Sequence, residues 1–462
     1  MPEHVIVLGA GVSGLSAAWR LTQKEIRADV FESAPAVGGL AGTLREGPYC
    51  LDIGPHSFFS EDQEIVKTVC DLFGGRLQPA PRRVKFYYKE KYIDYPLTTL
   101  GVLFQMGFFS GLRAALSFLK GKLFSHGRVP ASGEDETVEA WAIASFGEYL
   151  YTSFFKPYTE QFWKIPCSEL SSRSIPTNTR MSFMNTLKLL FQQKVTKAGN
   201  SLVEREMCPT YYPDTGFAEI AEQIARRVEE GQGRIHLGCE VTGVTELPGG
   251  RMRVTYRQEG HLKEMECDRV ISTVPIPVLT GMLWPSVPPE VLEAAKKLEY
   301  RSLVVLGMLT DKQNMLNCGY VYLLNRPYNR MFEMNEFSTF TSLPGENILA
   351  VEIPCLQNSA AWTATKEELF DMCIPSLAAD GFIAPGDVKK IFLVKAAHAY
   401  PIYRKDYGLQ LSRVMDHLKK YKSLATLGRC GEFRYMDVDE CMKRAFDLAE
   451  SLNGRSTSFG TL

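Results

Sequence analysis

Apolar and polar positions alternate in blocks along the first 32 residues, and these blocks define three elements. Residues 4–8 are a short apolar run typical of a buried strand, and residues 15–23 follow a helical pattern. A glycine turn at 9–14 joins them, and a second apolar run at 28–32 follows a polar connection. A strand, a helix and a second strand in this order predict a right-handed βαβ unit and a parallel sheet.

Strand patterns return in the second half of the chain. They cover 234–237, 240–244, 252–256, 270–274 and 424–428, and a helix is predicted over 438–452. The first two runs are predicted to form one strand around a turn, and Gly249-Gly250 is a hairpin signal. We expect these runs to complete the domain that the N-terminal unit begins.

Two long regions between these strands have a different character. Residues 96–204 are helical and rich in aromatics, whereas 276–394 mix strands with helices such as 288–298 and 365–378. A chain of 462 residues is also too long for one ordinary core. We therefore predict an α/β protein with two domains. The first is a Rossmann-like nucleotide-binding domain built from 1–95, 205–275 and 395–462. The second is an inserted mixed α+β substrate domain built from 96–204 and 276–394.

Composition narrows the choice of partner and compartment. The 52 basic and 53 acidic side chains nearly cancel, so nucleic acid is not an expected partner. The 11 cysteines include no C-x-x-C pair and no zinc-like cluster, so we expect no metal site. Scattered thiols and a start without a signal-peptide pattern predict a cytoplasmic protein.

The most apolar stretch, 101–128, allows two interpretations. No apolar run reaches the ~20 residues that span a bilayer, and Arg113, Lys120, Lys122 and Arg128 interrupt this one. It is either a helical flap of the second domain, which we favour, or a basic amphipathic helix in peripheral contact with a membrane.

The glycine turn matches G-x-G-x-x-G between a strand and a helix. Gly9 permits the tight turn, Gly11 lets the backbone approach a pyrophosphate, and Gly14 lets helix and sheet pack closely. Ser13 lies in the same turn. The pyrophosphate would meet free N–H groups at the helix N-terminus. Glu32 ends the second strand, where a carboxylate accepts hydrogen bonds from ribose hydroxyls.

Further motifs, in the same order along the whole chain, resemble the FAD-dependent amine oxidase and protoporphyrinogen oxidase superfamily. They are the second glycine cluster at 37–43, the D-x-V-I-x-x-x-P strand at 268–275 and the glycine motif at 428–431. The resemblance implies FAD as the cofactor. It implies a cofactor-binding set that comprises Gly9, Gly11, Ser13, Gly14, Glu32, Gly38, Gly39, Leu40, Thr43, Gly54, His56, Val241, Thr273, Gly428, Arg429, Tyr435 and Asp437.

Within that superfamily, three segments are most similar to UDP-galactopyranose mutases. They are the G-P-H segment at 54–59, the stretch Pro157–Trp163 and the arginine-rich motif at 428–439. In those mutases two arginines grip the UDP diphosphate, and tyrosines help to seat the phosphates and the sugar. The matching positions here are Arg330, Tyr322, Tyr400 and Tyr435. The second arginine is displaced: the expected place holds Asn178, and Arg180 follows two residues later.

The mutase resemblance implies a small-molecule substrate, a UDP-sugar, and a non-redox reaction. Reduced flavin N5 attacks the anomeric carbon and expels UDP, while guanidinium groups stabilise the charge on the leaving group. His56, if it lies against the flavin, can follow the flavin's redox state by changing its protonation or tautomer.

A second interpretation stays open. The chain would then be an oxidase or desaturase similar to protoporphyrinogen oxidase, in which oxidised FAD takes hydride from an apolar or amine-bearing substrate. The apolar stretch 101–128 and the aromatic run at 86–97 favour it, because a sugar-nucleotide enzyme does not require so much apolar surface.

Overall fold

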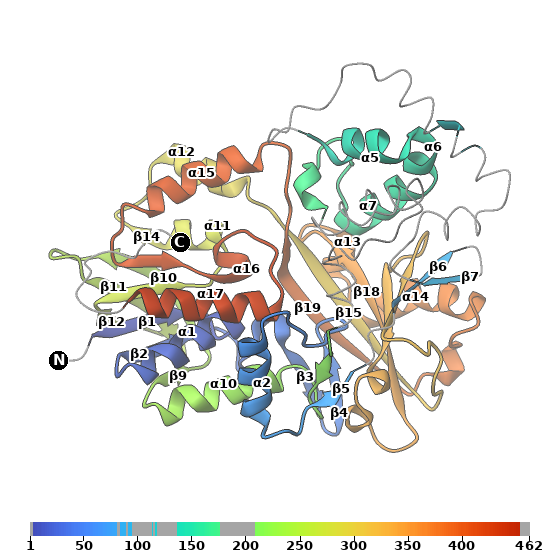
Figure 1. The fold of residues 1–462 in the computed structure, drawn as a ribbon, viewed down its shortest axis with the longest axis horizontal. Helices are drawn as coiled ribbons and strands as arrows, with labels where there is room; N and C mark the ends of the chain where they lie inside the picture. Colours follow the sequence, from blue (N-terminus) through green and yellow to red (C-terminus); the bar gives the residue numbers. More distant parts are fainter. Residues whose placement is uncertain are drawn as a thin grey trace, which may run out of the picture.

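The computed structural model describes residues 3–80, 84–88, 91–94, 113, 116, 117, 136–175 and 208–452. The described chain has two sides: a nucleotide-binding side with a parallel sheet, and a side built around a long antiparallel sheet (Figure 1). Almost all of the stretch 101–128, and Arg180, lie outside the described residues.

A five-stranded sheet, parallel throughout, forms the centre of the nucleotide-binding side. Helices α1 (Val12–Gln23), α10 (Glu219–Glu230) and α17 (Val438–Ser451) pack together beside it, with α1 between the other two (Figure 1). The predicted βαβ unit and parallel sheet are thus confirmed. The strand order is β20 (Leu424–Thr426), β13 (Arg269–Ser272), β1 (His4–Leu8), β2 (Arg27–Phe31) and β9 (Arg234–His236).

The runs predicted as one strand around a turn belong to two different sheets. β9 pairs with β2 in the parallel sheet, whereas the next strand, β10 (Cys239–Glu246), joins a separate four-stranded sheet. Gly238 separates them with a left-handed φ of 63°, which lets the chain change direction abruptly. The other strands of this second sheet are β11 (Met252–Gln258), β12 (His261–Cys267) and β14 (Leu283–Trp284).

A seven-stranded sheet dominates the other side. Its pairs are antiparallel except for β16 with β6, which is parallel. Two of its strands, β6 and β7, lie in the range 1–95 that the sequence assigned to the nucleotide-binding domain, because the chain crosses between the sides early. The order is β19 (Lys390–Pro401), β15 (Tyr300–Thr310), β18 (Asn347–Cys355), β17 (Arg330–Glu333), β16 (Tyr320–Leu323), β6 (Val84–Tyr88) and β7 (Lys91–Asp94).

The chain has further helices and strands outside these sheets and the three helices named above. The helices are α2 (Gln63–Phe73), α5 (Val138–Phe146), α6 (Glu148–Leu150), α7 (Lys156–Trp163), α11 (Ile276–Met282), α12 (Pro289–Lys296), α13 (Ala360–Thr363), α14 (Lys366–Ala379), α15 (Tyr407–Leu418) and α16 (Gly428–Gly431). The remaining strands are β3 (Thr43–Glu46), β4 (Tyr49–Asp52), β5 (Gln78–Pro79) and β8 (Tyr211–Tyr212). Short helical turns complete the set at Gly39–Ala41, Tyr151–Phe155, Ser172–Ser174, Met334–Glu336, Thr339–Thr341 and Pro385–Asp387.

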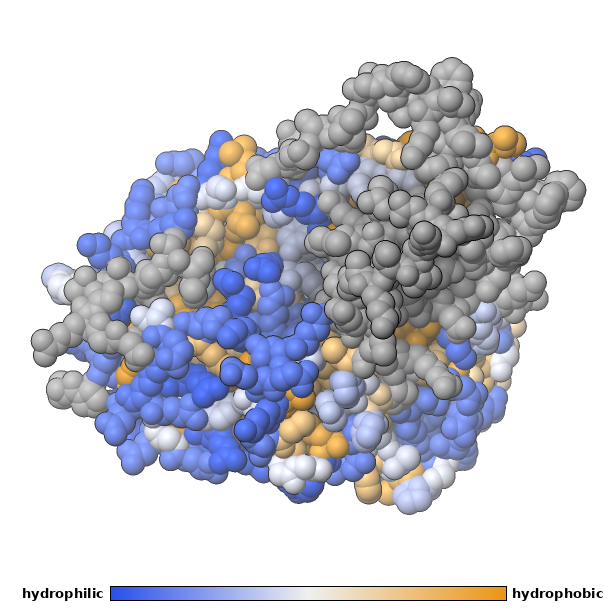
Figure 2. Space-filling model, viewed as in Figure 1, coloured by the Kyte–Doolittle hydropathy of each residue, from blue (hydrophilic) through white to orange (hydrophobic). Residues whose placement is uncertain are grey.

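One apolar core spans both sides of the molecule. It runs from α1, α10 and α17 to the inner face of the long sheet, and it includes Leu51, Leu303 and Phe332. The face shown in Figure 2 is mostly hydrophilic over the nucleotide-binding side, with hydrophobic side chains in smaller groups. All eleven cysteines are free thiols. Every helix in the described ranges falls short of the length and apolar character that a bilayer crossing requires.

Candidate active site

A cavity opens above the glycine turn at the carboxyl ends of β1 and β2. Its wall brings together segments that lie more than 400 residues apart in the sequence, as the predicted cofactor site requires. Twelve residues of the predicted cofactor set line it: Gly9, Gly11, Ser13, Glu32, Gly38, Gly39, Leu40, His56, Thr273, Gly428, Arg429 and Asp437.

The glycine turn and the helix behind it suit a pyrophosphate. Gly11 is the N-cap of α1 and supplies no side chain to cap it, so the first N–H groups of the helix are left for a ligand. A Cβ on Gly14 would lie 2.0 Å from the carbonyl oxygen of Gly9, so only glycine allows the helix to pack so closely. Glu32 accepts hydrogen bonds from the Ala10 and Ala34 N–H groups (2.8 and 2.9 Å), which hold its carboxylate at the cavity wall.

His56 lies on the cavity wall as a neutral imidazole. Its ring stacks on Phe217 with centroids 4.8 Å apart and planes 11° from parallel. Burial, together with the nearby charges of Arg429 and Arg330, lowers the pKa of His56 to about 3. Its Nδ1 atom is buried and has no hydrogen-bond partner among the described residues. A ring nitrogen in that state is suited to a polar atom of a bound cofactor.

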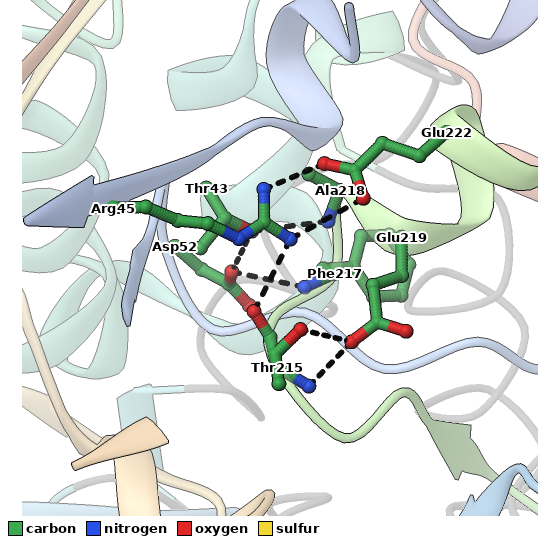
Figure 3. Close-up of polar contacts among 8 residues, drawn as sticks. All are labelled: Thr43, Arg45, Asp52, Thr215, Phe217, Ala218, Glu219 and Glu222. Atoms are coloured by element: carbon green, nitrogen blue, oxygen red, sulfur yellow. Dashed lines mark hydrogen bonds and ion pairs between the residues drawn. The ribbon is translucent and has the colours of Figure 1, made fainter. Parts of the chain in front are cut away.

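Figure 3 shows Asp52 with two of the groups that donate to it, the Thr43 hydroxyl and the Phe217 N–H. The buried carboxylate of Asp52 accepts from the Thr43 hydroxyl (2.6 Å) and the Phe217 N–H (3.0 Å) through Oδ1, and from the Tyr212 hydroxyl (2.6 Å) through Oδ2. Burial raises the pKa of Asp52 to about 6 in spite of these three donors. Asp52 therefore fixes the backbone that presents the Phe217 ring to His56.

A second set of polar side chains lies on the long sheet. Strand register places Phe86, Tyr322, Arg330 and Glu352 directly opposite one another on the four adjacent strands β6, β16, β17 and β18. Residues in such a row share one face of a sheet, and their side chains are in contact. The Phe86 and Tyr322 rings stack at 4.8 Å, and the Arg330 guanidinium lies 5.9 Å from the Tyr322 ring centre.

Arg330 is partly buried, 12% of its side chain being exposed, and it pairs with the fully buried Glu352. Its Nη2 donates to Glu352 Oε1 (2.8 Å) and to the Tyr400 hydroxyl (3.1 Å), and its Nε donates to Glu352 Oε2. Burial opposes the charge of Arg330, but the Glu352 carboxylate outweighs it and raises the pKa well above its ordinary value. Gly54 packs against this pair, because a Cβ there would lie 2.4 Å from Glu352 Oε1. The G-P-H segment thus joins the cavity to the arginine cluster.

Three guanidinium groups meet around the ring of Tyr400. Arg301 lies 4.2 Å and Arg429 5.5 Å from the ring centre, and Arg330 donates to the hydroxyl. Tyr435 stacks on Tyr400 at 5.8 Å, with planes 9° from parallel. Arg429 also lines the cavity, so the cluster and the cavity adjoin each other.

The structure brings together four of the predicted substrate residues, Arg330, Tyr322, Tyr400 and Tyr435, within one aromatic and cationic cluster. His56 joins it from the cavity side, since Arg330 and Arg429 both act on its pKa. Arg180 lies outside the described residues. The roles of these residues stay predictions.

Five members of the predicted cofactor set do not line the cavity: Gly14, Thr43, Gly54, Val241 and Tyr435. The Thr43 hydroxyl donates to Asp52 and accepts from the Ala218 N–H (3.0 Å), so it stabilises the wall from behind. Val241 is 8% exposed and packs in a core cluster with β11 and β13. Tyr435 is 42% exposed, and its hydroxyl donates to Asp437 (3.0 Å).

Sequence reasoning missed Arg301 and Glu352. Each is a single charged residue inside an otherwise apolar strand, in YRSLVVLGML and NILAVEIPC respectively. Charged side chains are rarely fully buried unless they are paired or functional, so a charge within an apolar strand was the available signal. The role of Asp52 was harder to predict from the sequence, because Asp52 lies at the end of a short hairpin and not inside an apolar strand.

A parallel sheet, a glycine turn and a cavity at the carboxyl ends of its strands define a dinucleotide-binding protein of the Rossmann type. Residues 12–389 match the family model described as flavin containing amine oxidoreductase. The chain therefore belongs to the family of flavin-containing amine oxidoreductases.

Curated relatives include both oxidases and mutases. Protoporphyrinogen oxidase 1, chloroplastic, of Arabidopsis thaliana is 24% identical over 67% of this chain and 59% of its own length. Coproporphyrinogen III oxidase of Bacillus subtilis (strain 168) is 22% identical over 61% of this chain and 62% of its own length. A probable UDP-galactopyranose mutase of Klebsiella pneumoniae is 24% identical over 36% of this chain and 43% of its own length. The chain thus spans less than two thirds of each of these relatives.

Solved structures share the fold along almost the whole chain. Reduced UDP-galactopyranose mutase superposes with a TM-score of 0.79 at 19% identity, covering 99% of this chain and 95% of the other. A putative protoporphyrinogen oxidase from Exiguobacterium sp. 255-15 gives 0.74 at 14% identity, covering 98% and 99%. At these identities the likeness establishes the fold.

FAD is the cofactor of this family member, and the cavity suits it. The uncapped N-terminus of α1 would hold the pyrophosphate, and Glu32 would hold a ribose. His56 lines this cavity and its Nδ1 is buried without a partner among the described residues, so a cofactor atom bound there could complete its hydrogen bonding. The protein is an FAD-dependent flavoenzyme of the amine oxidase superfamily.

Proposed function

We propose that this flavoenzyme acts on a nucleotide sugar in a reaction similar to that of UDP-galactopyranose mutases. The observation that carries the proposal is the cluster of Arg301, Arg330 and Arg429 around Tyr400. Among the described residues, the carboxylates close to this cluster are Glu352 and Asp437. Three cations against two anions leave a positive balance, which favours an anionic ligand such as a diphosphate.

The positive balance also argues against an amine substrate. A protonated amine would meet guanidinium groups in a half-buried place where charges are weakly screened. Like charges in such a place are unfavourable. The amine-bearing substrates of the oxidase interpretation are therefore the least suited to this site.

The residues present can perform the steps that a nucleotide-sugar reaction needs. Arg330 and Tyr400 would bind the diphosphate and stabilise the charge that builds on it as the sugar–phosphate bond breaks. The rings of Phe86, Tyr158 and Tyr322 form a wall of contacts, 4.8–5.7 Å apart, against which a base or sugar can pack. When bound in its reduced form, FAD supplies the nucleophile for the anomeric carbon.

A porphyrinogen-type oxidase is the second candidate. The chloroplastic protoporphyrinogen oxidase matches 67% of this chain, whereas the Klebsiella mutase matches 36%. Porphyrinogens carry carboxylates, so they too would suit a cationic site. The two candidates differ in the role of the flavin, because an oxidase substrate reduces it and a mutase substrate leaves its redox state unchanged.

The experiment that separates them is an anaerobic one. Chemically reduced enzyme is mixed with UDP-galactopyranose, and the products are analysed by chromatography; oxidised enzyme is mixed with a porphyrinogen, and the flavin absorbance is followed. Ring-isomerised UDP-sugar without net flavin oxidation supports the mutase proposal. Stoichiometric flavin bleaching by the porphyrinogen, with no reaction of UDP-sugars, overturns it in favour of the oxidase.

A further inference from the structure

Arg301 is a fully buried cation without a carboxylate partner among the described residues. Its side chain is 0% exposed, and within the described ranges its one hydrogen bond runs from Nη1 to the Phe162 carbonyl oxygen (2.7 Å). The Nε and Nη2 atoms have no partner in the described part of the chain. Burial lowers the pKa of Arg301 to about 10, so the group stays protonated at neutral pH. An unpaired buried charge is strongly unfavourable, and its presence calls for a role.

The contacts of Arg301 are with aromatic faces. Its guanidinium carbon lies 3.8 Å from the ring centre of Phe162 and 4.2 Å from that of Tyr400. Arg301 is paired with Tyr400 across β15 and β19, and the register shifts between Arg301 and Leu303. A cation over a ring face in a buried place is attracted to the negative face of the ring. Arg301 therefore fixes where the Tyr400 ring lies.

The hydroxyl of Tyr400 is arranged as a hydrogen-bond donor. Its oxygen accepts from Arg330 Nη2 at 3.1 Å, and no described group accepts its proton. The side chain is half-buried, so the hydroxyl is not sealed in the core. Because hydrogen bonds in a chain polarise one another, donation by Arg330 strengthens the hydrogen bond that the Tyr400 hydroxyl donates to an anion.

We propose that Arg301 is a positioning residue for the anion site: it holds the Tyr400 ring so that the Tyr400 hydroxyl, already hydrogen-bonded by Arg330, donates to an anionic oxygen of the substrate. The inference rests on the proposed function in taking that oxygen to belong to a phosphate. Arg301 acts through Tyr400 and does not itself touch the ligand, which agrees with its complete burial.

A double-mutant cycle tests the route of this effect. The dissociation constant for UDP is measured by flavin fluorescence in the wild type, Arg301→Met, Tyr400→Phe and the double variant. Each single change is expected to weaken UDP binding about tenfold, because one hydrogen bond to a charged group contributes about that much to affinity. The double variant is expected to bind no more weakly than the weaker single variant, because Arg301 acts only through the hydroxyl. Losses that multiply, or an unchanged Arg301→Met, overturn the proposal.

Further variants separate this role from a structural one. Arg301→Lys keeps the positive charge beside the Tyr400 ring and is expected to bind UDP within about threefold of wild type; a loss equal to that of Arg301→Met contradicts the proposal. Arg404→Met, which removes a partly exposed arginine paired with Glu299, is the matched control and should leave UDP affinity unchanged. Flavin content and melting temperature report folding, and Arg301→Gln replaces Arg301→Met in the cycle if the methionine variant does not bind FAD.

The same cycle is run with inorganic pyrophosphate as a second probe. If the wild type binds pyrophosphate but not UDP, the nucleotide part of the proposed function fails, and the pyrophosphate cycle still decides the role of Arg301. If the wild type binds neither anion, both the anion site and the role of Arg301 are refuted.

Discussion

Arg330 shows how a side chain can be largely withdrawn from solvent and still present its charge to a ligand. Glu352 accepts from two of its nitrogens, which compensates for the loss of hydration, and Tyr400 accepts from one of them as well. The pKa of Arg330 is raised above its ordinary value, so the guanidinium stays charged at every pH at which the enzyme would work. A fixed charge of this kind suits a diphosphate, which presents several acceptor oxygens at once.

Replacing Arg330 by alanine is expected to weaken UDP binding about tenfold to a hundredfold and to leave FAD bound, because Arg330 lies outside the cofactor cavity wall. The change leaves the buried Glu352 without its cation, so the Glu352→Gln change is combined with it to limit the loss of stability. Dissociation constants come from flavin fluorescence, and flavin content from absorbance.

Arg326→Ala is the control for that experiment. Arg326 is four residues away and pairs with Asp380 (2.6 and 2.7 Å), and it lies outside the Tyr400 cluster. Its loss should not alter UDP affinity. An Arg330→Ala variant that binds UDP as tightly as this control would remove Arg330 from the site.

At the scale of elements, the first strand, the glycine turn and α1 form the cofactor-binding unit. Gly11 of this turn lines the cavity, and α1 begins there without a side-chain cap. A side chain at Gly11 would occupy the place where a pyrophosphate approaches the helix N-terminus. The rest of the fold does not depend on that position, because the nearest atoms to an added Cβ are 3.9 and 4.0 Å away.

Gly11→Val is therefore expected to abolish FAD binding while the protein still folds. The absorbance ratio of flavin to protein measures the first effect, and far-ultraviolet circular dichroism measures the second. Gly281→Val serves as the control, since a Cβ there meets open space and the residue is outside the cavity. A Gly11→Val protein that retains a full complement of FAD would show that the pyrophosphate lies elsewhere.

The elements also show what a sequence can and cannot predict. The glycine turn, Glu32 and the strand at β13 are recognisable because each is a local pattern whose geometry is set by neighbouring residues. The row of Phe86, Tyr322, Arg330 and Glu352 is not, because it depends on the register of three strand pairs, one of which joins β6 to β16 more than 200 residues later. The separation of β9 from β10 was missed for the same reason: two adjacent apolar runs do not reveal which partner each will pair with.

At the scale of the whole molecule, a buried carboxylate ties the parallel sheet together. Asp29 on β2 accepts from His4 Nε2 on β1 (2.8 Å) and His236 Nε2 on β9 (2.7 Å), and also from Arg27 (3.0 Å). Burial alone would raise the pKa of Asp29, but these hydrogen bonds and the Arg27 charge outweigh it and hold the pKa well below its ordinary value. The network links three adjacent strands on the nucleotide-binding side.

This pKa shift predicts the direction in which acid affects stability. A carboxyl whose pKa is lower in the folded state stabilises the fold above its unfolded pKa, about 3.9, and the contribution is lost as pH falls toward the folded pKa. The melting temperature of wild type should exceed that of Asp29→Asn at pH 7, by a margin equivalent to about 2 kcal/mol. The gap should narrow as the pH falls below about 4. If the difference in melting temperature between wild type and Asp29→Asn widened on acidification, the pKa of Asp29 would not be lowered in the folded state.

The whole molecule places a cationic, aromatic cluster on the long sheet beside a flavin cavity on the parallel sheet, with the G-P-H segment between them. This arrangement is the basis for the proposal of a nucleotide-sugar substrate.

The most direct test of that proposal is a titration of the purified, FAD-loaded protein with UDP. Flavin absorbance and fluorescence are followed in the oxidised state and, under anaerobic conditions, in the reduced state. We predict saturable binding in both states that is tighter to the reduced enzyme, in keeping with a reaction that begins from reduced flavin. No response to UDP up to millimolar concentration in either state would contradict the nucleotide-sugar assignment and leave the porphyrinogen-type oxidase as the function to pursue.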